Sequence, residues 1–146
     1  MTASSPLVLD SAGLEALARA RPSDSIRALL AEAHRRGREV LVPTLVCAEV
    51  ARGQQRTRRL EAALHRHEAT QGERPPVRLV DTDFTLARQV GAILAATRSR
   101  SDRIVDAHTV AVAVAHGGGL VVTSDPDDIN ALAAAVPAAR IRVVAP

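Results

Sequence analysis

The sequence predicts an α/β fold with three layers, α/β/α, in which a mainly parallel central sheet carries helices on both faces. Short apolar runs typical of buried strands alternate with helical segments along the chain, an order that favours a parallel sheet. About half of the residues (47%) are hydrophobic but only 1% are aromatic, so Ala, Val, Leu and Ile must fill the core. Neither a repeat nor a linker-like segment interrupts the 146 residues, so we expect one domain over residues 1–146.

In the first half of the chain, apolar runs predict strands and apolar residues at helical spacing predict helices. The predicted elements are, in order, a strand at 6–9, a helix at 11–20, a helix from a cap at Ser23 to about 36, a strand at 39–42, a helix at 44–52 and a helix at 54–70. In the helix capped by Ser23, one face carries Ile26, Leu29, Leu30 and Ala33, and Gly37 ends it. Pro43 suits the first turn of the next helix, where no N–H bond is lost.

The second half continues the alternation after a loop marked by Gly72, Pro75 and Pro76. The predicted elements are a strand at 77–80, a helix from a cap at Thr82 or Asp83 to about 96, a polar loop at 97–102, a helix at 104–116, a strand at 120–123, a helix from Pro126 and a strand at 141–144. The Val and Thr content of 104–116 also suits a strand, and its length favours the helix. The glycines at 117–119 are expected to end that helix.

Composition excludes several classes of function. All 19 Lys+Arg residues are arginine, which removes every mechanism that needs a lysine amine. The net charge of +3 is compatible with a polyanionic partner. A single cysteine, Cys47, excludes an internal disulfide and fits a cytoplasmic protein. We expect no signal peptide and no membrane partner, because no apolar run reaches the ~18 residues that a spanning helix needs.

Four acids stand where a site can form. Asp10 directly follows the first predicted strand, and Asp125 follows the strand at 120–123 by one residue. Glu49 and Asp106 lie in helices among apolar neighbours, where an unpaired charge is costly. In open α/β sheets, sites form at the carboxyl ends of the strands, so these acids can converge there.

A simpler interpretation stays open for each acid taken alone. Asp10, Asp106 and Asp125 could be helix-start residues that the helix dipole favours. Four converging carboxylates would repel one another, and with no Lys in the chain only a cation or an Arg could hold them together. Oxygen ligands of this kind suit Mg²⁺ or Mn²⁺. The sequence has no P-loop motif and no Cys/His spacing typical of zinc.

Four segments of the chain resemble the PIN-domain ribonucleases, in particular the VapC toxins of bacterial toxin–antitoxin pairs. They are VLDS at 8–11, PTLVCAEVARG at 43–53, IVDAHTVAVA at 104–113 and LVVTSDPDDI at 120–129. Their order and spacing match the family over almost the whole chain, and the last two segments together are the most specific. The resemblance implies a single PIN-like nuclease domain and an endoribonuclease that depends on Mg²⁺ or Mn²⁺.

Carried over by position, the resemblance implies that Asp10, Glu49, Asp106 and Asp125 are the catalytic acids. We expect Asp10, Asp106 and Asp125 to hold the main ion, and Glu49 to orient the attacking water or to help bind a second ion.

Three further positions match the family. Ser11 matches a Ser or Thr that often follows the first Asp, and Thr123 matches the Thr before the last one, so both are expected to support the site. Asp128 matches a further acid and is an additional candidate metal ligand, although it equally suits a helix surface. Ala12 departs from the family pattern, which often has a second polar residue there.

RNA must be held by residues around an acidic centre that repels it. Arg98, Arg100 and Arg103 flank the loop before Asp106 and are candidate phosphate contacts. A second group on the helix at 54–70 and just before it equally suits a solvated helix face; it comprises Arg52, Arg56 and Arg59, with Arg58 and Arg66 nearby. With a single Phe, stacking of bases on aromatic rings is essentially excluded.

The resemblance also implies protein partners. A cognate VapB-like antitoxin would bind across the site, and an apolar groove formed by Leu14, Leu17, Ile26 and Leu30 is expected to receive it. Homodimerisation is common in the family. Two alternatives stay open: a catalytically inactive PIN-like module that only binds RNA or protein, and a nuclease that acts on DNA.

Overall fold

The computed structural model of the chain describes residues 4–68 and 76–146. The elements are, in chain order, β1 (Leu7–Leu9), α1 (Ser11–Ala18), α2 (Asp24–Arg35), β2 (Val40–Pro43), α3 (Thr44–Val50), α4 (Gln54–Arg66), β3 (Val77–Val80), α5 (Phe84–Ala96), the short 3₁₀ helix η1 (Ser101–Arg103), α6 (Ile104–Ala115), β4 (Gly118–Val122), α7 (Pro126–Ala133) and β5 (Arg140–Val144). The predicted end of α4 at residue 70 and the loop around Gly72 and Pro75 lie outside the described residues.

The five strands form one sheet in the order β3-β2-β1-β4-β5, and every neighbouring pair is parallel. Leu7 is in register with Val40 of β2 on one side and with Leu120 of β4 on the other. The carboxyl ends of β1 and β4 therefore lie side by side at the middle of the sheet. This is the edge at which Asp10 and Asp125 leave the strands.

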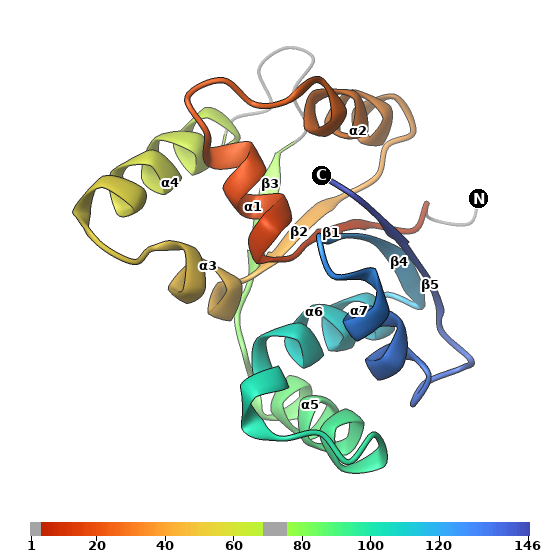
Figure 1. Cartoon of the computed structure of the whole chain (residues 1–146). Coiled ribbons are helices and arrows are strands. Elements are labelled where there is room, and N and C mark those ends of the chain that lie inside the picture. Colours follow the sequence, from red (N-terminus) through yellow and green to blue (C-terminus); the bar gives the residue numbers. More distant parts are fainter. Residues whose placement is uncertain (1–3, 69–75) are drawn as a thin grey trace.

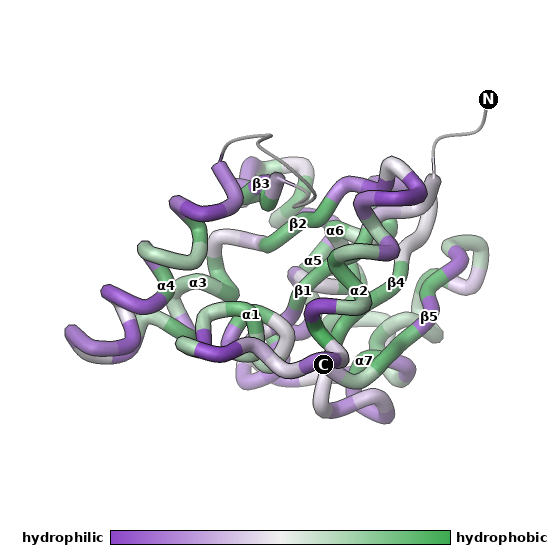
Figure 2. The backbone as a smooth tube through the Cα atoms, turned by 90° about the horizontal axis from the view of Figure 1, so that it is seen from above, coloured by the Kyte–Doolittle hydropathy of each residue, from purple (hydrophilic) through white to green (hydrophobic). Residues whose placement is uncertain are grey.

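Helices cover both faces of the sheet, which confirms the three-layer α/β/α prediction (Figure 1). Leu7 and Leu9 of β1 pack in a core with α1, α2, α3 and α4. Val8, between them, faces the opposite way and packs in a second core with α5, α6 and α7. This alternation along one strand follows from the two-residue period of β-structure. Figure 2 shows the hydrophobic residues concentrated in the central strands, whereas α4 is largely hydrophilic.

Most predicted elements are confirmed within a few residues. Ser23 caps α2 by accepting a hydrogen bond from the Ile26 N–H, and Asp83 rather than Thr82 caps α5. The segment at 104–116, whose composition also suited a strand, forms α6. Its middle is buried on all sides, and for this reason the segment lacks the polar stripe that marks a surface helix.

Three details differ from the sequence predictions. Pro43 is the last residue of β2 and precedes the first turn of α3 instead of lying in it. The polar loop at 97–102 leads into η1. Strand β4 begins at Gly118, so only Gly117 acts as the helix stop. Gly118 has φ +130°, and a Cβ there would lie 2.3 Å from the Arg140 carbonyl oxygen, so a glycine is needed where β4 meets β5.

The predicted apolar groove is wrong. Leu14, Leu17, Ile26 and Leu30 are all buried in the core formed with α1 and α2, with at most 7% of each residue exposed. They hold these helices on the sheet and offer no surface to a partner. In the described part of the chain, no helix is both long enough and apolar enough to span a membrane.

Candidate active site

Asp10 is fixed at the end of β1 by the backbone around it. Its N–H donates to the Val122 carbonyl of β4, and its carboxylate accepts a hydrogen bond from the Gly13 N–H at 3.0 Å. Asp10 is therefore the N-cap of α1, as the helix-start interpretation of this acid expected. The residue is 6% exposed, and this burial raises the pKa of Asp10, as the neighbouring charge of Asp125 also does to a smaller extent.

Thr123 links the first acid to the last. Its hydroxyl oxygen accepts a hydrogen bond from the Asp125 N–H at 3.0 Å, and the hydroxyl also bonds to the Asp10 carboxylate, which lowers the pKa of Asp10. Thr123 is 1% exposed and its N–H is bound to Val144 of β5. A buried threonine thus joins the ends of β1 and β4 through one hydroxyl.

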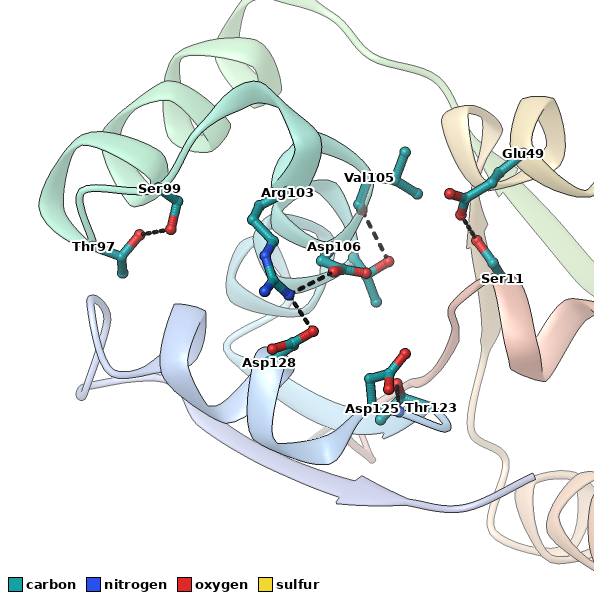
Figure 3. Close-up of polar contacts among 11 residues, drawn as sticks. Ser11, Glu49, Thr97, Ser99, Arg103, Val105, Asp106, Thr123, Asp125 and Asp128 are labelled. Atoms are coloured by element: carbon teal, nitrogen blue, oxygen red, sulfur yellow. Dashed lines mark hydrogen bonds and ion pairs between the residues drawn. The ribbon is translucent and has the colours of Figure 1, made fainter.

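Glu49 reaches the same region from α3. The Ser11 hydroxyl donates a hydrogen bond to its carboxylate, which connects the first turn of α1 to α3 (Figure 3). The two residues are 38 positions apart in the sequence, and both are partly buried. Ser11 therefore orients Glu49 in this structure rather than Asp10, which it follows in the chain.

Asp106 is an acid whose charged form is disfavoured by its surroundings. It lies in the first turn of α6 and is half-buried. Burial, followed by the charges of Asp10 and Asp128, raises the pKa of Asp106 to about 6, and Glu49 adds to this shift. Carboxylates from α3, α6, α7 and the end of β1 therefore act on one another at this edge of the sheet.

Asp125 and Asp128 differ in their surroundings. Asp125 is at the N-cap position of α7, yet its side chain makes no capping hydrogen bond, and the residue is exposed. Asp128 is ion-paired with Arg103, whose guanidinium also lies 3.9 Å from Asp106 (Figure 3). The hydrogen bond to Asp128 raises the pKa of Arg103 still further, so this cation stays charged between the two acids.

The donor chemistry of these acids fits a divalent cation. All of the ligands would be carboxylate oxygens, which suit Mg²⁺ or Mn²⁺, and a cation would favour the charged form of Asp106, which burial and then the neighbouring carboxylates disfavour. The side-chain positions do not enclose one: among residues 4–68 and 76–146, no three Asp, Glu, His or Cys side chains are arranged to hold a metal. Glu49 is engaged with Ser11, and Asp106 and Asp128 share Arg103. Metal binding by Glu49 and Asp106 would therefore require Glu49 to leave Ser11 and Asp106 to leave Arg103.

The arginines predicted near the site fall into two kinds. Arg103 is held by acids and is not free for a phosphate in this conformation. Arg98 and Arg100 are exposed, and Arg98 has φ +53° in the turn that ends α5, where its N–H donates to the Ala95 carbonyl. Such a left-handed residue is usually glycine. The turn fixes the start of the segment that leads to Asp106.

A separate group of arginines lines a cleft between α1, α3 and α4. Arg56 and Arg59, for which the sequence left phosphate contacts and a solvated helix face equally open, line it together with Arg19, whereas Arg52, Arg58 and Arg66 do not. Sequence reasoning missed Arg19, because nothing in the sequence indicates that the end of α1 lies against α4. Sequence reasoning also missed the ion pairing of Arg103 with the acids of the site. The i,i+3 spacing between Arg103 and Asp106 was a signal for it.

Comparisons with known proteins agree with this architecture. The sequence model of the PIN domain matches residues 8–135. Among solved structures, the chain is similar to FitAB bound to an IR36 DNA fragment, with 18% identity, a TM-score of 0.63 and coverage of 95% of this chain and 94% of that one. It is also similar to VapBC2 from Rickettsia felis bound to a DNA fragment from their promoter, with 12% identity, a TM-score of 0.61 and coverage of 94% and 97%. No curated protein sequence matches the chain.

Proposed function

The chain belongs to the PIN-domain family, and from this membership we propose that it is a metal-dependent endoribonuclease, the toxin of a toxin–antitoxin pair. The observation that carries the proposal is the convergence of carboxylates from four elements: Asp106, whose pKa is raised first by its burial, is also acted on by the charges of Asp10, Asp128 and Glu49. A group of acids that destabilises its own charged state is typical of a functional site rather than of a structural one. The VapC-like motifs supply the substrate class and the toxin role.

In this proposal Asp10, Asp106 and Asp125 would hold Mg²⁺ or Mn²⁺, with Glu49 beside them. A bound ion would supply a water of lowered pKa and neutralise charge on the phosphate. The protein's own contribution is orientation. Thr123 keeps the Asp10 carboxylate at the end of β1, and Ser11 holds Glu49 until a ligand competes for it.

Arg103 has a further role in the proposed site. It pairs with Asp128 and partly offsets the charge of Asp106 in this structure, and it would release Asp106 when an ion binds. Asp128 then keeps Arg103 close by, through the ion pair between them. The role of Asp128 in this scheme is to position Arg103 rather than to bind the metal directly.

Cleavage of a labelled RNA oligonucleotide in Mg²⁺, Mn²⁺ or EDTA tests the proposal. We expect Asp106→Asn and Asp125→Asn to lower the rate more than about 100-fold, because even outer partners of a metal site cost 10- to 100-fold. Asp127→Asn is the matched control, because it removes the same charge from an exposed position of α7 outside the group of acids. Full activity of both site variants contradicts the assignment.

The same assay separates the alternatives. A single-stranded DNA of the same sequence tests for a nuclease that acts on DNA. Absence of both metal binding and cleavage, with RNA or protein binding retained, favours an inactive PIN-like binding module.

We further propose one domain over residues 1–146, a VapB-like antitoxin partner and a homodimer.

Exposed apolar residues support a protein partner: Phe84 at the start of α5 is 78% exposed, and Leu79 and Ile104 are 43% and 39% exposed. Size-exclusion chromatography with light scattering tests the homodimer, and Phe84→Glu should shift a dimer toward the monomer if α5 forms the interface. If the wild-type protein is a monomer, the proposed homodimer is wrong.

A further inference from the structure

We propose that the cleft between α1, α3 and α4 is an anion subsite that holds a backbone phosphate of the RNA strand next to the acidic site. The inference rests on the proposed function, because it assigns residues that would position the same substrate. The cleft has a volume of about 230 Å³. Its lining residues are Glu15, Ala18 and Arg19 from α1 and the turn after it, Val50 from α3, and Arg56 and Arg59 from α4.

The cleft is positively charged. Its lining includes three arginines and one acid, Glu15, and none of the three arginines forms an ion pair within the described part of the chain. Arg56 and Arg59 are three residues apart on α4, so their side chains share a face of that helix. Arg19 reaches the cleft from the C-terminal end of α1. Three exposed arginines without ion-pair partners, one at the end of α1 and two on α4, create a positive potential that favours the binding of an anion.

The cleft adjoins the acidic site through two shared elements. Val50, in its lining, directly follows Glu49 on α3. Helix α1 begins at Ser11, which binds Glu49, and passes Glu15 before it ends directly ahead of Arg19, so both lining residues are close in sequence to the acidic site. At 1.5 Å of rise per residue, Glu15 lies about 6 Å along the helix from Ser11. In Figure 1, α1, α3 and α4 lie together on one side of the sheet.

The chemistry of the lining favours a phosphate over a peptide. Only Ala18 and Val50 are apolar, so the cleft offers little surface for the side chains of a peptide. It has no aromatic ring on which a base could stack. A guanidinium fork matches phosphate oxygens, and contacts to the backbone hold a strand without reading its sequence. An acidic centre needs such contacts beside it, because it repels the strand that it must cleave.

Fluorescence anisotropy with a labelled single-stranded RNA in EDTA tests the subsite independently of cleavage. We expect the Arg56→Ala/Arg59→Ala double variant to bind about tenfold more weakly, as for the loss of charged hydrogen bonds. The dependence of log K on log salt should also become shallower, by about 0.7 for each phosphate that the variant no longer neutralises. Arg19→Ala should weaken binding in the same direction. Arg58→Ala is the matched control, because it removes the same charge from α4 outside the cleft.

Several outcomes overturn the subsite. They are an absence of RNA binding by the wild-type protein, an unchanged affinity in the double variant, and an equal loss in Arg58→Ala, which would indicate diffuse charge attraction. An oligoglutamate peptide is the second probe: if the double variant loses this peptide but keeps RNA, the cleft binds an acidic protein segment instead. Thermal unfolding of each variant verifies that the fold is intact.

The two proposals can fail separately. If the wild-type protein cleaves RNA with Mg²⁺ or Mn²⁺ but the double variant binds RNA normally, only the subsite is wrong. If no metal supports cleavage while RNA binding still depends on Arg56 and Arg59, the nuclease proposal is wrong and the subsite stands. If both hold, the double variant should raise KM for cleavage and leave kcat unchanged, because it removes binding shared by substrate and transition state.

Discussion

At the scale of single residues, the charge on Asp106 is costly to the folded protein. Its pKa is raised to about 6 by burial and by neighbouring carboxylates, and Arg103 offsets only part of this. Because the folded protein binds a proton more tightly than the unfolded chain does, stability falls as the pH rises from about 4 to about 6. Above that range the carboxylate is ionised and the full cost is present.

Asp106→Asn should therefore stabilise the protein. We expect a gain of about 1 kcal/mol in the free energy of unfolding near pH 7.5, after discounting the shift for the partial exposure of the group. The gain should shrink below about pH 6 and vanish only well below the ordinary Asp pKa of 3.8, where the wild-type carboxyl is neutral in both the folded and the unfolded state. Urea unfolding at a series of pH values measures it. Asp127→Asn, on the exposed side of α7, should show no such dependence, and a destabilised Asp106→Asn protein would refute the argument.

Thr123 acts through Asp10. Thr123→Val keeps the shape of the side chain but removes the hydroxyl that lowers the pKa of Asp10, so this pKa should rise further, which NMR titration of the Asp10 carboxyl would detect. Thr109→Val is the control, because its buried hydroxyl bonds only to the Val105 carbonyl within α6. If the pKa of Asp10 is the same in the wild type and in Thr123→Val, Thr123 does not support Asp10.

At the scale of elements, the site depends on how closely α1 approaches β4. Gly13 lies in the first turn of α1, where its N–H binds the Asp10 carboxylate. A Cβ at this position would lie 3.0 Å from the Val122 carbonyl oxygen and 3.1 Å from the Val122 Cβ. The absence of a side chain thus allows the helix to hold Asp10 against the end of β4.

Gly13→Ala should destabilise the protein by about 1–3 kcal/mol, the usual cost of an overpacked contact. Gly91→Ala is the matched control in α5, because a Cβ there meets nothing within 4 Å and alanine stabilises a helix by about 0.5–1 kcal/mol relative to glycine. Chemical unfolding of both variants measures the change in the free energy of unfolding, which should be a loss for Gly13→Ala and a gain for Gly91→Ala. If Gly13→Ala is as stable as Gly91→Ala, the close approach does not constrain α1.

At the scale of the whole molecule, the acids connect two cores that are otherwise separated by the sheet. Glu49 belongs to the layer of α1–α4, whereas Asp106 and Asp128 belong to the layer of α5–α7. Asp10 and Asp125 leave the sheet between them. A cation bound by these acids would therefore join both layers, and its effect should extend to global stability.

Mn²⁺ should raise the unfolding temperature of the wild-type protein in proportion to the logarithm of its concentration. At 100 times the dissociation constant, binding to the folded state alone adds about 2.7 kcal/mol. Asp106→Asn should lose most of this response, and Asp127→Asn should keep it. Differential scanning calorimetry with EDTA as the blank provides the measurement without recourse to nuclease activity. An equal response in all three proteins would contradict a site at Asp106.

The extent of correct prediction differs between fold and site. The helix at Ile104–Ala115 was predictable from the length of its segment, and the strand ends before Asp10 and Asp125 from short apolar runs, because both are local properties of the sequence. The groove assigned to Leu14 and Leu30 was not, since an apolar helix face looks the same whether it packs on its own sheet or on a partner. The partners of Arg103 and the cleft at Arg19 depend on contacts between distant segments.

The sequence by itself determined that acids follow apolar strands in an alternating α/β chain without lysine, and it determined the family through its motifs. Parallel strands place their carboxyl ends at one edge, so the convergence of these acids followed from topology. Only the tertiary structure decided how each acid is held: Asp10 by Thr123 and the start of α1, Glu49 by Ser11, and Asp106 and Asp128 by Arg103. The physical reason is that pKa values and ion pairs depend on burial and on a few ångströms of separation, which the order of residues along the chain does not specify.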